Sequence, residues 1–175
     1  MAAARLASLA LLALLAACGF QPLYGQGPRQ ADPAQLGNIE VAPIADRLGQ
    51  ITRNHLLDRL NPRGRPVAPE YRLDVTLHES NQRLAFRKDA TATRALIKLV
   101  AQYRLIEIAS GTPVHTGASR ATASYNIVAS DFATIATEKN ARERVSRIVA
   151  EDVALRLSVC FSRRETCFKR PAPAP

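Results

Sequence analysis

Two long segments of this chain alternate strictly between apolar and polar residues, and this alternation constrains the fold more than any other feature. In the first segment, polar residues separate Tyr71, Leu73, Val75 and Leu77. In the second, one strand face would carry Ala95, Ile97, Leu99, Ala101, Tyr103 and Leu105. Because successive side chains of a strand point to opposite faces, both segments are predicted to be strands with one buried face. We expect them to form a hairpin whose tip lies near residues 87–89.

Two further elements are predicted before this hairpin. Residues 38–43 read as a short first strand closed by proline. Asp46 is the expected N-cap of a helix that ends at Asn61, before Pro62. His55 falls within the apolar stripe of this helix, so we interpret it as a core or boundary histidine and not as a ligand.

The segments after residue 78 carry weaker signals. After the polar stretch 79–82 the apolar residues change strand face, to Leu84 and Phe86, and this change predicts a bulge or kink in the second strand. Residues 114–127 read as a fourth strand rich in small and hydroxylated residues. Ser130 or Asp131 should cap a final helix reaching about residue 158, on which Asp152 pairs with Arg156. The apolar face of this helix is predicted to comprise Ala141, Val145, Ile148, Val149 and Leu155.

The resulting element order is β-α-β-β-β-α. Successive strands joined by short turns pair antiparallel, and amphipathic helices must cover an apolar sheet face. The predicted fold class is therefore α+β, a two-layer sandwich in which two helices pack on a mostly antiparallel four-stranded sheet.

The first eighteen residues have the pattern of a lipoprotein signal. Arg5 precedes an apolar run from Leu6 to Ala17, which is too short for a membrane span of about 20 residues but fits a secretory signal. The small residues before Cys18 favour cleavage there, so that this cysteine becomes the lipidated N-terminus, with acyl chains such as palmitate. The alternative is an ordinary hydrophobic N-terminal helix. Gly19, in place of Asp, favours sorting to the outer membrane.

These patterns divide the chain into four predicted parts. Residues 1–17 are the signal peptide, and residues 18–37, rich in proline and glycine, are a lipid-anchored flexible tether. Residues 38–158 form one α+β domain. Residues 159–175 are a C-terminal extension that ends in a mobile, proline-rich tail.

Charge narrows the class of partner. The formal net charge is +9, and removal of Arg5, the only charge in residues 1–17, leaves +8. In a cytosolic protein this excess would indicate nucleic acid, but export removes that partner. Lipid headgroups and the phosphates of lipopolysaccharide are the anions expected outside the inner membrane. The alternative is a solvated cationic surface without a ligand.

Cysteine content agrees with export. With Cys18 lipidated, Cys160 and Cys167 remain as an even pair, and we expect them to form a disulfide in an oxidising compartment. The sequence offers neither a Cys-x-x-Cys motif nor a nearby histidine ligand, so no metal site is predicted.

Catalytic motifs are missing from the sequence. The three histidines, His55, His78 and His115, stand singly, and no nucleophile elbow or metal-binding motif accompanies them. Ser80 and Asp74 share a predicted strand with His78, but such an arrangement is too common to indicate a hydrolase. We therefore predict a protein that is not an enzyme and needs no cofactor.

A basic cluster is the most distinctive candidate binding site. Four cations flank the predicted hairpin tip around Phe86, namely Arg83, Arg87, Lys88 and Arg94. Cations beside an aromatic ring at a projecting turn suit an amphiphile that carries phosphates. The alternative is a loop that charge merely keeps soluble.

Residues 18–25, Cys-Gly-Phe-Gln-Pro-Leu-Tyr-Gly, resemble the lipid-attachment opening of the LptE family of lipopolysaccharide-assembly lipoproteins. The strand at 39–44 and the helix ending at residue 61 are also similar to that family. The Cys160 and Cys167 pair and the proline-rich tail are not part of the resemblance.

The resemblance implies a non-enzymatic role as a plug and assembly partner of the outer-membrane β-barrel LptD. It also implies lipopolysaccharide binding near the loop between the second and third strands, at Arg87 and Lys88 with Arg83 and Arg94 as neighbours. The protein would then be lipid-anchored on the periplasmic face of the outer membrane. The alternative function is that of a lipid-binding auxiliary lipoprotein in another envelope transport system.

Overall fold

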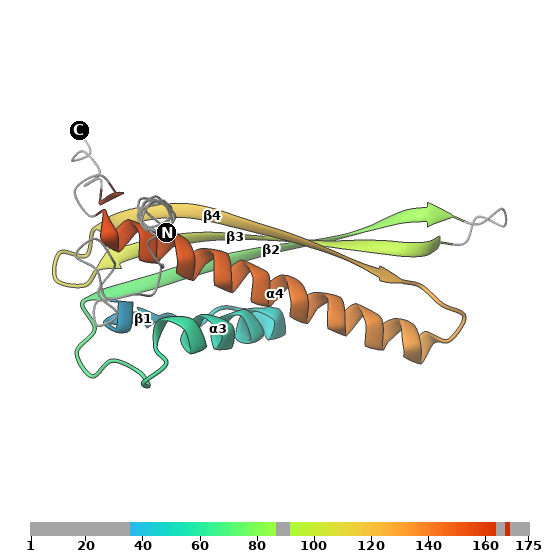
Figure 1. The fold of residues 1–175 in the computed structure, drawn as a ribbon, viewed down its shortest axis with the longest axis horizontal. Helices are drawn as coiled ribbons and strands as arrows, with labels where there is room; N and C mark the ends of the chain where they lie inside the picture. Colours follow the sequence, from blue (N-terminus) through green and yellow to red (C-terminus); the bar gives the residue numbers. More distant parts are fainter. Residues whose placement is uncertain (1–35, 87–91, 164–166, 169–175) are drawn as a thin grey trace, which may run out of the picture. The chain divides into compact units, whose positions relative to one another are not determined.

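The computed structural model describes residues 36–86, 92–163 and 167–168, which belong to one compact unit, Ala31–Pro175 (Figure 1). The elements follow in the order β1 (Ile39–Val41), α3 (Asp46–Leu60), β2 (Tyr71–Phe86), β3 (Ala92–Glu107), β4 (Pro113–Asn126) and α4 (Asp131–Ser162). The predicted signal peptide, most of the tether, the hairpin tip and the proline-rich tail lie outside the described residues.

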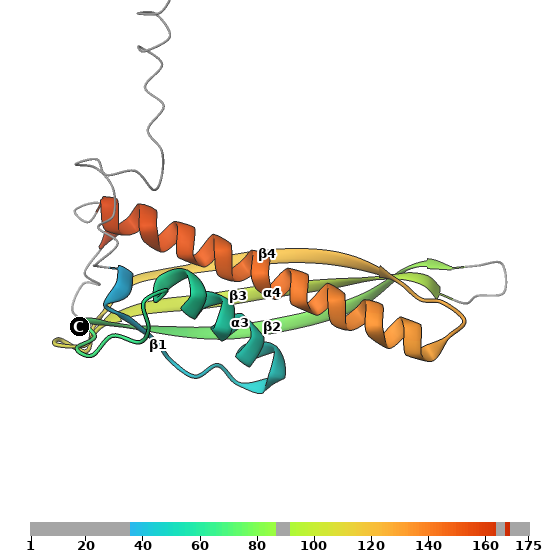
Figure 2. The ribbon, with the colours of Figure 1, turned by 60° about the horizontal axis from the view of Figure 1, so that its bottom comes forward.

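The four strands form one sheet in the order β1-β2-β3-β4. β1 runs parallel to β2, with Ile39 opposite Tyr71, whereas β2, β3 and β4 pair antiparallel. Figure 2 shows that α3 and α4 both cover the same face of this sheet. The other face carries no helix among the described residues. The predicted α+β sandwich with its mostly antiparallel sheet is confirmed.

The core lies between the sheet and the two helices. All six predicted core residues of β3 are at most 3% exposed, because alternation places them together on the helix side. α4 contributes an apolar stripe at intervals of four residues: Ala141, Val145, Val149, Val153 and Leu157. One continuous cluster results, which β1, α3 and β2 complete.

The predicted apolar face of α4 was wrong at two positions. Ile148 is 43% exposed and Leu155 is 41% exposed. The buried stripe instead continues through Val153 and Cys160, and at about 100° per residue Ile148 and Leu155 lie more than about 100° around the helix from its centre. The sequence offers apolar residues on both sides of this helix, so periodicity alone did not identify the packed face.

The predicted irregularity in β2 is confirmed, and it lies directly after the polar stretch 79–82. Pairing between β2 and β3 is unbroken from Tyr71 to Arg83, and the register shifts only between Arg83 and Phe86. The polar stretch itself stays in register, and its inward side chains have partners: Glu79 accepts a hydrogen bond from Arg142, and Asn81 donates one to Tyr125.

The helix ends differ in how well the sequence predicts them. Ser130 caps α4 as predicted and accepts a hydrogen bond from the backbone N–H of Ala133. Asp46 is not the N-cap of α3. Ala45 occupies that position without a side-chain hydrogen bond, and Asp46 is the first helical residue, with φ of 66°.

The C-terminal helix continues past its predicted end near residue 158. α4 extends to Ser162 because Cys160 and Phe161, at 2% and 4% exposure, remain part of the packed interior. Phe161 meets Tyr71 edge to face with ring centroids 5.3 Å apart. None of the helices in the described part of the chain has both the length and the apolar character required to cross a membrane.

Candidate functional site: the hairpin end and its adjoining groove

The two described cations of the predicted binding cluster lie on neighbouring strands. Arg83 pairs with Ala95, and Arg94 pairs with Ala85. Ala95 is buried under the helices, so Arg83 shares the helix side of the sheet and Arg94 lies on the open side. Both are exposed. The hairpin end therefore presents positive charge on both faces, while Arg87 and Lys88 lie outside the described residues.

A polar network occupies the helix side of the sheet next to Arg83. Asn81 donates hydrogen bonds to the Tyr125 hydroxyl at 2.9 Å and to Glu138 at 3.4 Å. Arg142 lies 2.9 Å from a Glu79 oxygen and 2.8 Å from a Glu138 oxygen. Burial alone would lower the pKa of Arg142, but the hydrogen bond to Glu79 and the two carboxylate charges raise it. These two carboxylates neutralise Arg142, so it is not free to bind an anion.

A groove of about 540 Å³ opens between the start of α3 and the first half of α4. Its apolar lining comes from Leu48, Ile51 and Ile135. Arg47 and Lys139 also line it, and neither has an ion-pair partner within the described part of the chain. Ile135 is 64% exposed and Phe132, one helical turn away, is 82% exposed. Asp46, Glu79 and Glu138 line it as well, so the charges of the lining balance and the groove can hold an apolar chain without a net preference for an anion.

Sequence reasoning missed this groove. Its walls come from two helices about 90 positions apart in the chain, and their approach depends on packing that no local pattern reports. The local signal for this groove is the pair Phe132 and Ile135. Large apolar side chains at the start of a helix usually belong to its buried face, and exposed ones indicate a binding surface.

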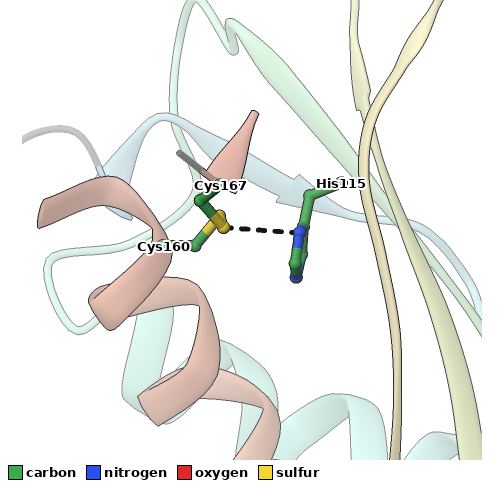
Figure 3. A group of neighbouring side chains, drawn as sticks. All are labelled: His115, Cys160 and Cys167. Atoms are coloured by element: carbon green, nitrogen blue, oxygen red, sulfur yellow. Dashed lines mark hydrogen bonds between the residues drawn. A yellow bond between two sulfur atoms is a disulfide. The ribbon is translucent and has the colours of Figure 1, made fainter. Parts of the chain in front are cut away.

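A second cluster lies at the opposite end of the sheet (Figure 3). Cys160 and Cys167 are joined by a disulfide with their Cα atoms 5.2 Å apart. His115 of β4 places its Nδ1 atom 3.4 Å from the Cys167 sulfur, and burial lowers the pKa of this imidazole. The expectation that no histidine lies near the cysteines was wrong, because β4 supplies one from 52 positions away.

The ligand atoms of His115, Cys160 and Cys167 lie within 4.8 Å of one another. The sulfurs are bonded to each other, however, and only thiolates bind metal strongly. In this state the cluster is structural. It holds Phe168 against Phe161 and Tyr71, with ring centroids 5.2 Å and 5.9 Å apart.

The other histidines fit the sequence interpretation. His55 is half-buried on α3 and lies 2.8 Å from a Glu143 oxygen, as a boundary residue would. Asp74 accepts hydrogen bonds from Arg72, and no hydrogen bond joins His78 to Ser80 among the described residues. The three candidate hydrolase residues of β2 therefore form no catalytic arrangement.

Comparison with known proteins identifies a family. The family model LptE, described as lipopolysaccharide-assembly, matches residues 36–157. A candidate lipoprotein from Caulobacter crescentus CB15 superposes with a TM-score of 0.61 at 25% identity, covering 74% of this chain and 95% of that one. Rare lipoprotein B from Shewanella oneidensis superposes with a TM-score of 0.56 at 11% identity, covering 73% and 98%. A search of curated proteins found no match.

Proposed function

Because the chain belongs to the LptE family of lipopolysaccharide-assembly proteins, a family without enzymatic activity, we propose that it is the plug and assembly partner of an LptD-like outer-membrane β-barrel. In this role it binds lipopolysaccharide for insertion into the outer leaflet. The family match over residues 36–157 is the observation that carries the proposal, since it extends from the first residues of the described fold to the last turns of α4.

The proposed location follows from the N-terminal sequence. After cleavage of residues 1–17, lipidated Cys18 would hold the protein at the periplasmic face of the outer membrane. More than one acyl chain is needed for stable anchoring, which a lipoprotein N-terminus provides. Residues 18–37 would serve as the tether, residues 38–158 as the family domain, and residues 159–175 as an extension.

The proposed lipopolysaccharide site is the β2–β3 hairpin end. Arg87 and Lys88 are its main cations, with Arg83 and Arg94 as neighbours. Arg83 and Arg94 are exposed on opposite faces of the sheet. This exposure supports the proposal, because each face then offers one arginine that can bind a phosphate of the lipid. Guanidinium groups bind phosphates through paired hydrogen bonds. The glycolipid would thus be held by its anionic part.

A double charge reversal tests this site. We expect Arg87→Glu with Lys88→Glu to weaken binding of purified lipopolysaccharide at least about tenfold, because two attractive contacts become repulsive. The matched control is Arg63→Glu with Arg65→Glu, which makes the same change in charge in an exposed turn at the other end of β2. Equal weakening by both pairs would show that only net charge matters, and unchanged binding by the first pair would remove the hairpin end from the site.

A barrel interior is a suitable place for such a domain. The lumen of large outer-membrane barrels is polar, and the helix-free face of the sheet is also polar and basic, with Arg94, Lys98, Arg104 and Arg120 exposed on it. These charges support a wet, polar interface with the barrel wall. An auxiliary role in another envelope transport system would share the anchor and the fold, and it differs in the partner that copurifies.

A further inference from the structure

The disulfide and the imidazole beside it bring three potential metal ligands together. His115 comes from β4, Cys160 from the last turn of α4 and Cys167 from the segment after that helix (Figure 3). Their ligand atoms lie within 4.8 Å of one another. While the two cysteines are bonded to each other, the imidazole is the one strong metal ligand among the three, because sulfur binds metal as a thiolate. Cleavage of the disulfide would supply two more.

The spacing of these atoms is close to that of a zinc site. In a tetrahedral site with Zn–S bonds of about 2.3 Å and Zn–N bonds of about 2.0–2.1 Å, a sulfur and a nitrogen lie about 3.6 Å apart and two sulfurs about 3.8 Å apart. The Cys167 sulfur lies 3.4 Å from the Nδ1 atom of His115. The Cα atoms of the two cysteines are 5.2 Å apart, which leaves room for both sulfurs on one ion. After reduction, only the Cys160 sulfur has to turn away from that of Cys167.

Contacts other than the disulfide hold Cys167 in place. Its backbone N–H donates a hydrogen bond to the Arg163 carbonyl at 3.0 Å. Phe168, the next residue, packs its ring against those of Phe161 and Tyr71, with centroids 5.2 Å and 5.9 Å apart. We therefore expect Cys167 to stay beside the end of α4 when the disulfide is reduced.

The fold itself positions the other two ligands. His115 pairs with Leu105 in the sheet, and its ring centroid lies 5.9 Å from that of Tyr103. Cys160 is buried in the packed interior at the end of α4. Ligands on a strand and a helix are more precisely placed than ligands on loops, so little ordering is needed when the ion binds.

We propose that the reduced protein binds one Zn²⁺ ion through the thiolates of Cys160 and Cys167 and the Nδ1 atom of His115. Two cysteines and one histidine are a donor set that zinc accepts in proteins, with a water molecule in the fourth position. Thiolate and imidazole ligands favour zinc over magnesium and calcium, which prefer oxygen. This inference needs neither lipopolysaccharide nor a barrel, so it stands apart from the proposed function.

The reducing step requires a dithiol as co-reactant. One thiolate of the dithiol attacks the Cys167 sulfur, because Cys167 is half-buried whereas Cys160 is buried. The S–S bond breaks, Cys160 leaves as a thiolate, and a mixed disulfide joins Cys167 to the reductant. The second thiolate of the reductant then displaces Cys167. The dithiol becomes a disulfide, its two electrons and two protons pass to the two cysteines, and zinc binding releases those protons.

Zinc titration of the full mature chain in its oxidised and reduced forms tests the inference. The reduced form is prepared with a phosphine, which is removed before Zn²⁺ is added without oxygen at about pH 7.5, where a free imidazole is neutral. A chromophoric chelator reports the free zinc. We expect the reduced form to bind one ion per chain and the oxidised form to bind at least about a hundredfold more weakly, since it lacks the thiolates. Equal affinities of the two forms would overturn the inference.

A matched pair of histidine variants separates this site from nonspecific binding to thiols. His115→Gln keeps both cysteines. We expect it to weaken zinc binding by the reduced chain at least about a hundredfold, because loss of even an outer partner of a metal ligand costs about 10- to 100-fold. His78→Gln, at an exposed position, should leave the affinity unchanged. Equal affinities of all three reduced proteins would overturn the inference.

Cobalt(II) in place of zinc tests the unchanged protein, so it decides the question even if His115→Gln folds poorly. We expect the reduced chain to give the intense visible bands of a tetrahedral Co²⁺ site together with thiolate-to-cobalt charge-transfer absorption. The weak spectrum of octahedral Co²⁺ without charge-transfer absorption would show that the thiolates do not bind the ion, and it would overturn the inference.

Discussion

We predict that position 117 tolerates only glycine without loss of stability, because the ring of Tyr103 packs directly against it. The two residues are paired on β3 and β4, and a Cβ on Gly117 would overlap the Tyr103 hydroxyl and ring. Tyr103 is 3% exposed, and its ring centroid lies 5.9 Å from that of His115. The phenol is therefore part of the packed core and has to shift if a methyl group is added at Gly117.

The expected magnitude for Gly117→Ala combines two opposing terms. Forcing a methyl group into a packed core costs about 1–3 kcal/mol. Replacing glycine by alanine within a strand stabilises by about 0.5–1 kcal/mol through backbone entropy. We expect a net loss of about 1–2 kcal/mol, which lowers the melting temperature of a chain of this size by about 2–8 °C.

Thermal unfolding followed by circular dichroism measures this effect. Gly37→Ala is the matched control, because nothing lies within 4 Å of a Cβ at that position. Tyr103→Phe removes the atom nearest to the new methyl group, so the double variant with Gly117→Ala should lose less stability than the two single changes summed. A melting temperature for Gly117→Ala equal to that of the Gly37→Ala control would refute the packing argument.

Three further predictions concern charge, covalent structure and capping. Burial lowers the pKa of His115, so its contribution to stability is complete above about pH 6.5 and decreases as the pH falls and the unfolded chain takes up the proton first. His115→Gln should flatten the loss of stability between about pH 7 and 5, whereas His78→Gln, at an exposed position, should not. Cys160→Ser should lower the free energy of unfolding by about 2 kcal/mol without changing lipopolysaccharide binding, and two free thiols in the oxidised mature protein would contradict the bridge. Ser130→Ala should cost about 1 kcal/mol in chemical denaturation, since it removes the N-cap of α4; an unchanged midpoint would show that the cap is dispensable.

The strands were predictable because their signal is local. The alternation of β3 from Ala95 to Leu105 identifies a buried face without knowledge of any partner. The bulge after the polar stretch of β2 was predictable from the change of strand face. The partners of Glu79 and Asn81 were not predictable, because they lie on α4 and β4, far away in sequence.

The candidate site likewise has one part that the local sequence predicts and another part that depends on distant residues. The hairpin end could be located, since the four cations flank one predicted turn. That Arg83 and Arg94 face opposite sides of the sheet depends on where the register shifts, and no composition pattern specifies that position. The groove beside α3 and the approach of His115 to the disulfide depend on tertiary packing alone.

We propose that this lipoprotein acts with an outer-membrane barrel in lipopolysaccharide assembly. The most direct test is affinity purification of the tagged, acylated protein from its own outer membrane in mild detergent, with the copurifying proteins identified by mass spectrometry. We predict a large β-barrel in stoichiometric amount that withstands stringent washing. Recovery of the protein alone, or together with inner-membrane transporter subunits, would contradict the claim.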